Sequence, residues 1–324
     1  LAPGAGLRGA LGADASVEVD QDAVTGTLGA TSPALTLQGV GPWAVDGRGR
    51  LEGTALALES LEARGYGGRL VAEGPLALSP SARTDLRLRA EGFDVAALAR
   101  AFAGAEVPVA SRADGALRWE TTGWDVDAAR GTGEITLRPS PRPTTPGPGL
   151  PLSGSARVRI AGRALALEGA RVEARGARVT LDARLAADGT VRGSWGATLP
   201  LASVDALLAD VGAEALVPEA YTGTLVAEGD LSGPASSPES GFALRSEDLV
   251  ARGHPHSVQA QARYAAGRLA LAPLVVQSGP GQVTLAGSVP VLADAGEWDL
   301  RGEVEALELA PALALAGIAG GGPV

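Results

Sequence analysis

The two histidines of the chain, His254 and His256, stand in the sequence Gly-His-Pro-His. Imidazole nitrogens are common zinc ligands, and alternate residues of a strand share one face, so the pair could supply two ligands. Zinc sites take at least three protein ligands, and no third candidate stands near this pair in the sequence. Pro255 also breaks a strand pattern. We therefore expect a polar turn here and no metal site.

Other reactive residues form no recognisable catalytic arrangement. A Ser-His-Asp triad would need one of the two histidines, and the chain lacks the Gly-x-Ser-x-Gly turn of many hydrolases. Carboxylates alternate with arginines along strand-like segments, which is typical of a solvated face. The glycine-rich stretch ARGYGGRL from Ala63 precedes no helix, so hairpin turns with positive φ explain it better than a phosphate-binding loop. We expect no catalytic residues and no cofactor, and thus no enzyme.

The composition limits the kinds of core and partner. Apolar residues make up 45% of the 324 residues but aromatic residues only 3%, so any dry face must consist of Leu, Val and Ala. No cysteine is present to form a disulfide or a thiolate metal site. The net charge of −10 argues against binding nucleic acid through its phosphates. No run of eighteen apolar residues occurs, so we expect any membrane anchor to lie outside this piece of chain.

Period-two alternation dominates the sequence and predicts strands with one dry and one wet face. It is clearest in residues 84–91, 178–185 and 297–305. One-sided alternation favours an antiparallel sheet over the doubly buried strands of a parallel one.

Short helices are expected at three places. Val95–Phe102 and Val204–Ala209 are rich in Ala and Leu, and Ser203 is a candidate N-cap of the second. Ala310–Ala316 is a weaker candidate for a third helix because it contains Pro311. Helices this short cannot cover the predicted sheets.

A segment that begins Leu-Ala-Leu recurs at Leu56, Leu165 and Leu269, and the next strand opens thirteen residues later in each copy. This spacing indicates about three repeats of roughly 107 residues, within one continuous array over residues 1–324. We divide the array into 1–53 (the end of one repeat and the start of the next), 54–104 (the first recurring block), 105–212 (the second repeat, with a proline-rich loop at 138–151), 213–317 (the third repeat) and 318–324 (a glycine-rich tail).

The dry face of each strand needs a cover. Too few helices are predicted, and aromatic anchors for a packed sandwich are scarce. We therefore predict an all-β fold: an elongated, curled, mostly antiparallel sheet that forms a half-pipe groove with an aliphatic lining. The predicted lining is Leu86, Leu88, Trp119, Val158, Ile160, Val179, Leu181, Leu185, Val283, Leu285, Trp298, Leu300 and Val304. The residues predicted to face water are Arg87, Arg89, Asp182, Arg184, Arg301 and Glu303.

Three segments carry a resemblance to a known family: LALESLEARGYGGRLVAEGPLAL, TDLRLRAEGFDVAALARAF and WDLRGEVEALELAPAL. They resemble the TamB/AsmA-like repeat proteins of the bacterial envelope over most of residues 40–316. The resemblance implies a taco-shaped β-sheet whose apolar groove carries phospholipid between the inner and outer membranes. It also implies a periplasmic location, an inner-membrane anchor outside this piece, and no catalytic residues. The partners implied are phospholipid acyl chains, neighbouring β-repeats of the full-length chain and a β-barrel protein of the outer membrane.

Two alternative functions and one alternative fold remain at this point. A scaffold for assembly of outer-membrane proteins would use the same repeats. A surface or stalk protein would use them only as structure, with closed and dry interiors. A carbohydrate-active parallel β-helix repeats every 20–30 residues or so and often stacks asparagines, whereas this chain has a much longer period and no Asn.

Overall fold

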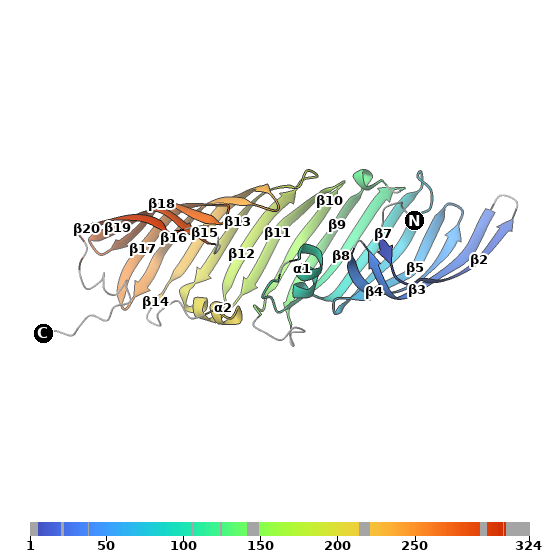
Figure 1. The fold of residues 1–324 in the computed structure, drawn as a ribbon, viewed down its shortest axis with the longest axis horizontal. Helices are drawn as coiled ribbons and strands as arrows, with labels where there is room; N and C mark the ends of the chain where they lie inside the picture. Colours follow the sequence, from blue (N-terminus) through green and yellow to red (C-terminus); the bar gives the residue numbers. More distant parts are fainter. Residues whose placement is uncertain are drawn as a thin grey trace. The chain divides into compact units, whose positions relative to one another are not determined.

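The structure, a computed structural model, is all-β (Figure 1). It describes residues 6–20, 23–37, 39–104, 106–123, 125–140, 149–213, 221–291, 297–306 and 308. The helices within these residues are short: α1 (Val95–Ala103), α2 (Val204–Asp210), and the 3-10 turns η1 (Val126–Ala128) and η2 (Leu201–Ser203). The predicted all-β class with a few short helices is confirmed.

The chain divides into two compact units, residues 1–168 and 169–324, and the strand β11 (Ala164–Ala174) crosses the division. In the first unit, each strand from β2 to β10 pairs antiparallel with the next, and β1 pairs with β3 beyond the end of the β2 ladder. These strands are β1 (Leu7–Arg8), β2 (Gly12–Asp20), β3 (Ala23–Leu37), β4 (Val40–Glu52), β5 (Ala55–Gly65), β6 (Gly68–Ala77), β7 (Arg83–Asp94), β8 (Ser111–Thr122), β9 (Arg130–Pro139) and β10 (Ser153–Ala161).

The second unit is built in the same way. The strands β12, β13, β15, β16, β17, β18, β19 and β20 pair antiparallel in that order, and the short β14 pairs with β16. They are β12 (Ala177–Leu185), β13 (Thr190–Pro200), β14 (Tyr221–Thr222), β15 (Thr224–Pro234), β16 (Glu239–Ala251), β17 (His254–Ala265), β18 (Arg268–Ser278), β19 (Gly281–Pro290) and β20 (Asp299–Glu305). The predicted antiparallel pairing is therefore confirmed in both units.

Tight hairpin turns join the first two strands of the recurring segments. Tyr66 and Gly67 have φ of 51° and 73°, and Arg175 and Gly176 have φ of 49° and 88°. Two successive positive φ angles define the two-residue turn that matches the right-handed twist of a hairpin. The glycine-rich stretch around Gly67 is thus a hairpin turn, as predicted. The division into three repeats stays a prediction.

The two helices begin close to the predicted residues. At the start of α1 the Asp94 carboxylate accepts a hydrogen bond from the Ala97 amide at 2.9 Å, and the helix ends at Gly104 with φ of 64°. Ser203 occupies the N-cap position of α2, but its hydroxyl makes no capping bond. Ser203 also closes the turn η2, so its own backbone is already helical; the predicted N-cap position is confirmed, but without a capping hydrogen bond. Residues 310–316 lie outside the described residues.

The predicted turn at GHPH is also wrong, because His254, Pro255 and His256 open the strand β17. Pro255 lies opposite Val250 of β16, whereas the β17–β18 ladder begins only at His256. A proline is tolerated where one side of a strand needs no donor, and Pro255 occupies such a position.

Candidate functional site

Alternation along the strands gives each unit one apolar and one charged face. In β7, Leu86 is buried and Leu88 half-buried, whereas Arg87 and Arg89 are exposed. The strand β12 follows the same pattern: Leu181 and Leu185 are half-buried, and Asp182 and Arg184 are exposed.

The strand register joins the apolar residues of the first unit into continuous rows. Leu88 lies opposite Ala72 on one side and Leu117 on the other, and the row continues through Gly133 to Val158. Directly opposed residues in an antiparallel pair project from the same face. A parallel row runs through Leu86, Trp119, Gly131 and Ile160.

Equivalent rows cross the second unit. Leu285 of β19 lies opposite Leu274 and Gly302. The remaining predicted residues of this unit fall into neighbouring rows. The opposed pairs are Val179 with Ala197, Leu181 with Trp195, Leu185 with Val191, Val283 with Val276 and with Val304, and Leu300 with Gly287.

The apolar faces remain partly accessible. Of the predicted lining residues, only Leu86 is buried, at 7% exposure, and Val304 is 63% exposed. The half-buried residues are Leu88, Trp119, Val158, Ile160, Leu181, Leu185, Val283 and Leu285, and the other exposed ones are Val179, Trp298 and Leu300. Trp298 precedes β20 and has no strand partner among the described residues. The role of all these residues in contacting lipid stays a prediction.

Glycines bring large aliphatic side chains close to the backbone of the neighbouring strand. A Cβ added at Gly47 would lie 2.9 Å from Leu61 Cδ1, and one at Gly302 would lie 2.7 Å from Leu285 Cδ2. In both cases the leucine leans over the glycine that lies opposite it in the ladder. This pairing fills what would otherwise be gaps in the rows. In the sequence, glycines at alternate positions of a strand are the signal for this kind of pairing.

Each unit curls toward its apolar face. The Trp43 ring of β4 meets the Phe93 ring of β7 with centroids 6.0 Å apart, although β5 and β6 lie between these strands. Strands in a flat sheet would place the two backbones about 14 Å apart. In the second unit, Trp195 of β13 meets Phe242 of β16 at 5.4 Å across β15.

The helices α1 and α2 each lie at an end of the strands of their own unit. The helix α1 contacts β4, β7 and β8, and Tyr66 and Phe102 bring their rings within 6.4 Å. In the second unit, Leu201 of η2 packs with Leu249, Val258 and Val276 in the principal hydrophobic cluster of that unit. Leu274 and Val283, which belong to the apolar rows of this unit, also pack against this cluster.

The opposite faces carry ion pairs. Arg118 donates to both carboxylate oxygens of Asp85, at 3.1 and 2.7 Å, and this hydrogen bond holds the pKa of the Asp85 carboxyl below its usual value. Arg263 and Glu239 pair at 2.7 Å in the second unit. These side chains are largely solvated, so they add little stability and mainly keep this face wet.

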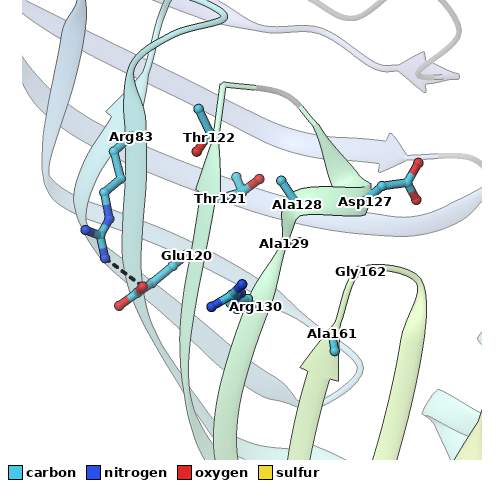
Figure 2. Close-up of a pocket in the computed structure, with 10 residues that line it drawn as sticks. All are labelled: Arg83, Glu120, Thr121, Thr122, Asp127, Ala128, Ala129, Arg130, Ala161 and Gly162. Carbon is cyan, nitrogen blue, oxygen red and sulfur yellow. Dashed lines mark hydrogen bonds and ion pairs between the residues drawn. The ribbon is translucent and has the colours of Figure 1, made fainter.

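A polar hollow lies at the end of the first unit's strands that is away from α1. Figure 2 shows the side chains around it, including the ion pair between Arg83 and Glu120 at 2.7 Å. It has a volume of about 560 Å³, and two arginines and two carboxylates line it together with threonine, alanine and glycine. The full lining is Arg83, Glu120, Thr121, Thr122, Asp127, Ala128, Ala129, Arg130, Ala161 and Gly162. Its balanced charge indicates no particular ligand.

A buried polar pair lies in the apolar face of the second unit. His256 is 4% exposed and Ser278 0%, and the two residues are directly opposed in the β17–β18 ladder. The two imidazole nitrogens and the serine hydroxyl have no hydrogen-bond partner among the described residues. Burial lowers the pKa of His256, and the neighbouring His254 lowers it further. The neutral imidazole is therefore the favoured form in the folded protein.

The described residues contain neither a cluster of metal ligands nor a membrane-spanning helix. No group of three or more His, Cys, Asp or Glu side chains there could hold a metal ion. None of the helices described is long and apolar enough to cross a membrane.

The fold and faces together define a class: an all-β protein of open antiparallel sheets, each with one apolar and one charged face. Comparison of the chain with protein-family models, with curated proteins and with solved structures gives no match. Any functional assignment therefore has to come from the faces themselves.

Proposed function

We propose that the apolar faces bind phospholipid acyl chains and that the chain is a non-catalytic lipid-carrying segment of a cell-envelope protein of the TamB/AsmA-like kind. The observation that carries the proposal is the register. It aligns half-exposed aliphatic residues of successive strands into rows, such as Leu88, Leu117 and Val158 in the first unit. Accessible apolar surface of this continuity usually marks a binding site for an apolar partner.

The chemistry of the rows suits an acyl chain. They offer methyl and methylene groups, with only scattered polar atoms such as those of His256 and Ser278. At about 0.8 kcal/mol per buried CH₂, a chain of about sixteen carbons gains roughly 10 kcal/mol relative to water when it is mostly covered. The same chain in a bilayer is already in an apolar medium, so transfer from the membrane costs little in either direction. A surface with these energetics carries lipid without trapping it.

The test is the lipid content of the purified protein. The full chain, exported to a bacterial periplasm and purified without detergent, should retain phospholipid detectable by mass spectrometry of an organic extract. Val179→Asp should lower the amount several-fold, because an acyl chain would have to desolvate the new carboxylate. Val179 is 44% exposed, so this change costs little folding stability.

The matched control is Thr180→Asp, which adds the same charge at the next residue of β12. Thr180 is exposed and alternates with Val179, so it lies on the charged face. Retained phospholipid should be unchanged in this variant. Protein without phospholipid, or an equal loss in both variants, would refute the proposal and favour a purely structural repeat.

A further inference from the structure

We propose that the charged face of the first unit binds a dianionic oxyanion of the phosphate-monoester class between Arg87 and Arg89. Arg87 and Arg89 alternate along β7 with Leu86 and Leu88 of the apolar rows, so they project from the charged face, and the site does not depend on the lipid proposal. It is a hollow of about 610 Å³ on β6, β7, β8 and β9. Its lining is Arg69, Val71, Glu73, Arg87, Leu88, Arg89, Ala116, Leu117, Arg118, Thr132, Gly133 and Glu134.

Small residues explain the hollow. Arg89 lies opposite Val71 on one side and Ala116 on the other, so its long side chain stands beside two short ones. Thr132 follows Arg118 in the adjacent row. Residues of four strands thus line the hollow, and four arginines are among them.

The arginines of the hollow differ in what holds them. Arg118 is held by Asp85 and, at 3.0 Å, by Glu120. Arg69 lies 3.8 Å from both Glu62 and Glu91.

Arg87 and Arg89, by contrast, form no salt bridge or side-chain hydrogen bond with the residues that the structure describes. Arg87 even lies directly opposite Arg118, a like-charge arrangement that costs stability in an antiparallel pair. An anion bound beside the Arg87 guanidinium would offset the repulsion from Arg118.

The spacing suits one tetrahedral oxyanion. Arg87 and Arg89 project from the same face two residues apart, which is about 6.7 Å along a strand. Guanidinium groups are planar forks that bind phosphate oxygens in pairs, and two of them can bind one phosphate from both sides. Glu73 lines the same hollow opposite Arg87 without a salt bridge to it, so its carboxylate opposes anion binding.

The test is calorimetric titration of the full chain with inorganic phosphate at low ionic strength. We expect saturable binding that Arg87→Gln and Arg89→Gln each weaken about tenfold, the effect of losing a hydrogen bond to a charged group. Glu73→Gln should strengthen binding by removing the repulsion. Arg184→Gln removes an exposed arginine of the charged face in the other unit, and should leave binding unchanged.

Binding to phospholipid vesicles distinguishes the two possible sources of the phosphate group, a lipid headgroup and a soluble phosphate ester. If vesicles of phosphatidylcholine with phosphatidic acid bind the protein and displace phosphate, and Arg87→Gln prevents this, the ligand is a lipid headgroup. If they do not bind while phosphate does, the ligand is a soluble phosphate ester. Absence of saturable phosphate binding, or equal weakening by Arg184→Gln, would overturn the site. Circular dichroism of each variant checks that the fold is retained.

Discussion

The rings of Trp195 and Phe242 meet with centroids 5.4 Å apart although the strand β15 lies between their strands. Gly229 of β15 is directly opposite both residues, and its missing side chain is what lets the rings meet. The Trp195 indole N–H also donates to the Ser240 hydroxyl at 2.8 Å. This contact packs the two rings over Gly229 on the apolar face of the second unit.

The first prediction concerns that glycine. A Cβ at Gly229 would lie 2.5 Å from both Phe242 Cβ and the Gly241 carbonyl oxygen, so Gly229→Ala must push β16 away from β15. We expect it to lower the free energy of unfolding by about 1–3 kcal/mol, the usual cost of overpacking. The control is Gly241→Ala on the neighbouring strand, where a Cβ meets nothing within 4 Å. Urea unfolding measures both, and an equal shift in the two variants would contradict the packing account.

The second prediction concerns pH and His256. Burial lowers its pKa in the folded protein from the usual 6.5, so folding favours the neutral imidazole. The stability due to the neutral form is present above pH 6.5 and is lost as the pH falls below it, because the unfolded chain then binds the proton more readily. The melting temperature should therefore fall between about pH 7 and pH 5, above the range in which the carboxylates titrate.

His256→Leu is the variant for this measurement. It removes two unpartnered buried nitrogens, so it should flatten the pH dependence without lowering stability at neutral pH. His254→Leu, two residues away and less buried, is the control and should keep most of the dependence. A pH profile that is the same in the wild type and in His256→Leu would contradict the assignment.

The third prediction concerns the link between α2 and a hairpin turn. Arg175 donates to both oxygens of Asp210, at 2.7 and 2.8 Å, and this lowers the pKa of the Asp210 carboxyl. The stability it contributes is present above the usual pKa of 3.8 and is lost as the pH falls through the lowered value.

A double-mutant cycle with Arg175→Gln and Asp210→Asn should show a favourable coupling at neutral pH. The coupling should exceed that of the Arg263–Glu239 pair, which has a single close contact and a more exposed carboxylate. Equal couplings in the two cycles would show that the α2 link contributes no more than an ordinary surface pair.

The period-two pattern was sufficient to predict most strands and their faces, and the Ala- and Leu-rich segments predicted the two helices. It assigned Leu86, Leu88, Arg87 and Arg89 to opposite faces because alternation is a property of one strand alone. The rows could not be predicted in this way. Which residue lies opposite Leu88 depends on the turn and bulge geometry of each hairpin, and bulges shift the register in several of these ladders.

The hollow around Arg87 and Arg89 and the aromatic contacts could not be predicted from the sequence, for the same reason. The hollow needs Arg87, Ala116 and Thr132 in adjacent rows of different strands, and no local pattern reveals this. Trp195 stands among the glycines of β13, which interrupt the alternation, so its face could not be assigned. The strand at Pro255 could not be predicted because Pro255 pairs only with β16. It has no partner on the other side because β18 ends at Ser278, opposite His256, and the local sequence does not reveal this.

The central claim is that acyl chains lie on the apolar faces, and site-specific photo-cross-linking tests it most directly. A photo-reactive residue at Leu285 lies on the apolar face of β19, and one at the next residue, Ala286, lies exposed on the charged face opposite Arg301. With the protein expressed in a bacterial envelope, irradiation should yield a phospholipid adduct at position 285 and little or none at 286. Absence of an adduct at 285, or equal adducts at the two positions, would contradict the account.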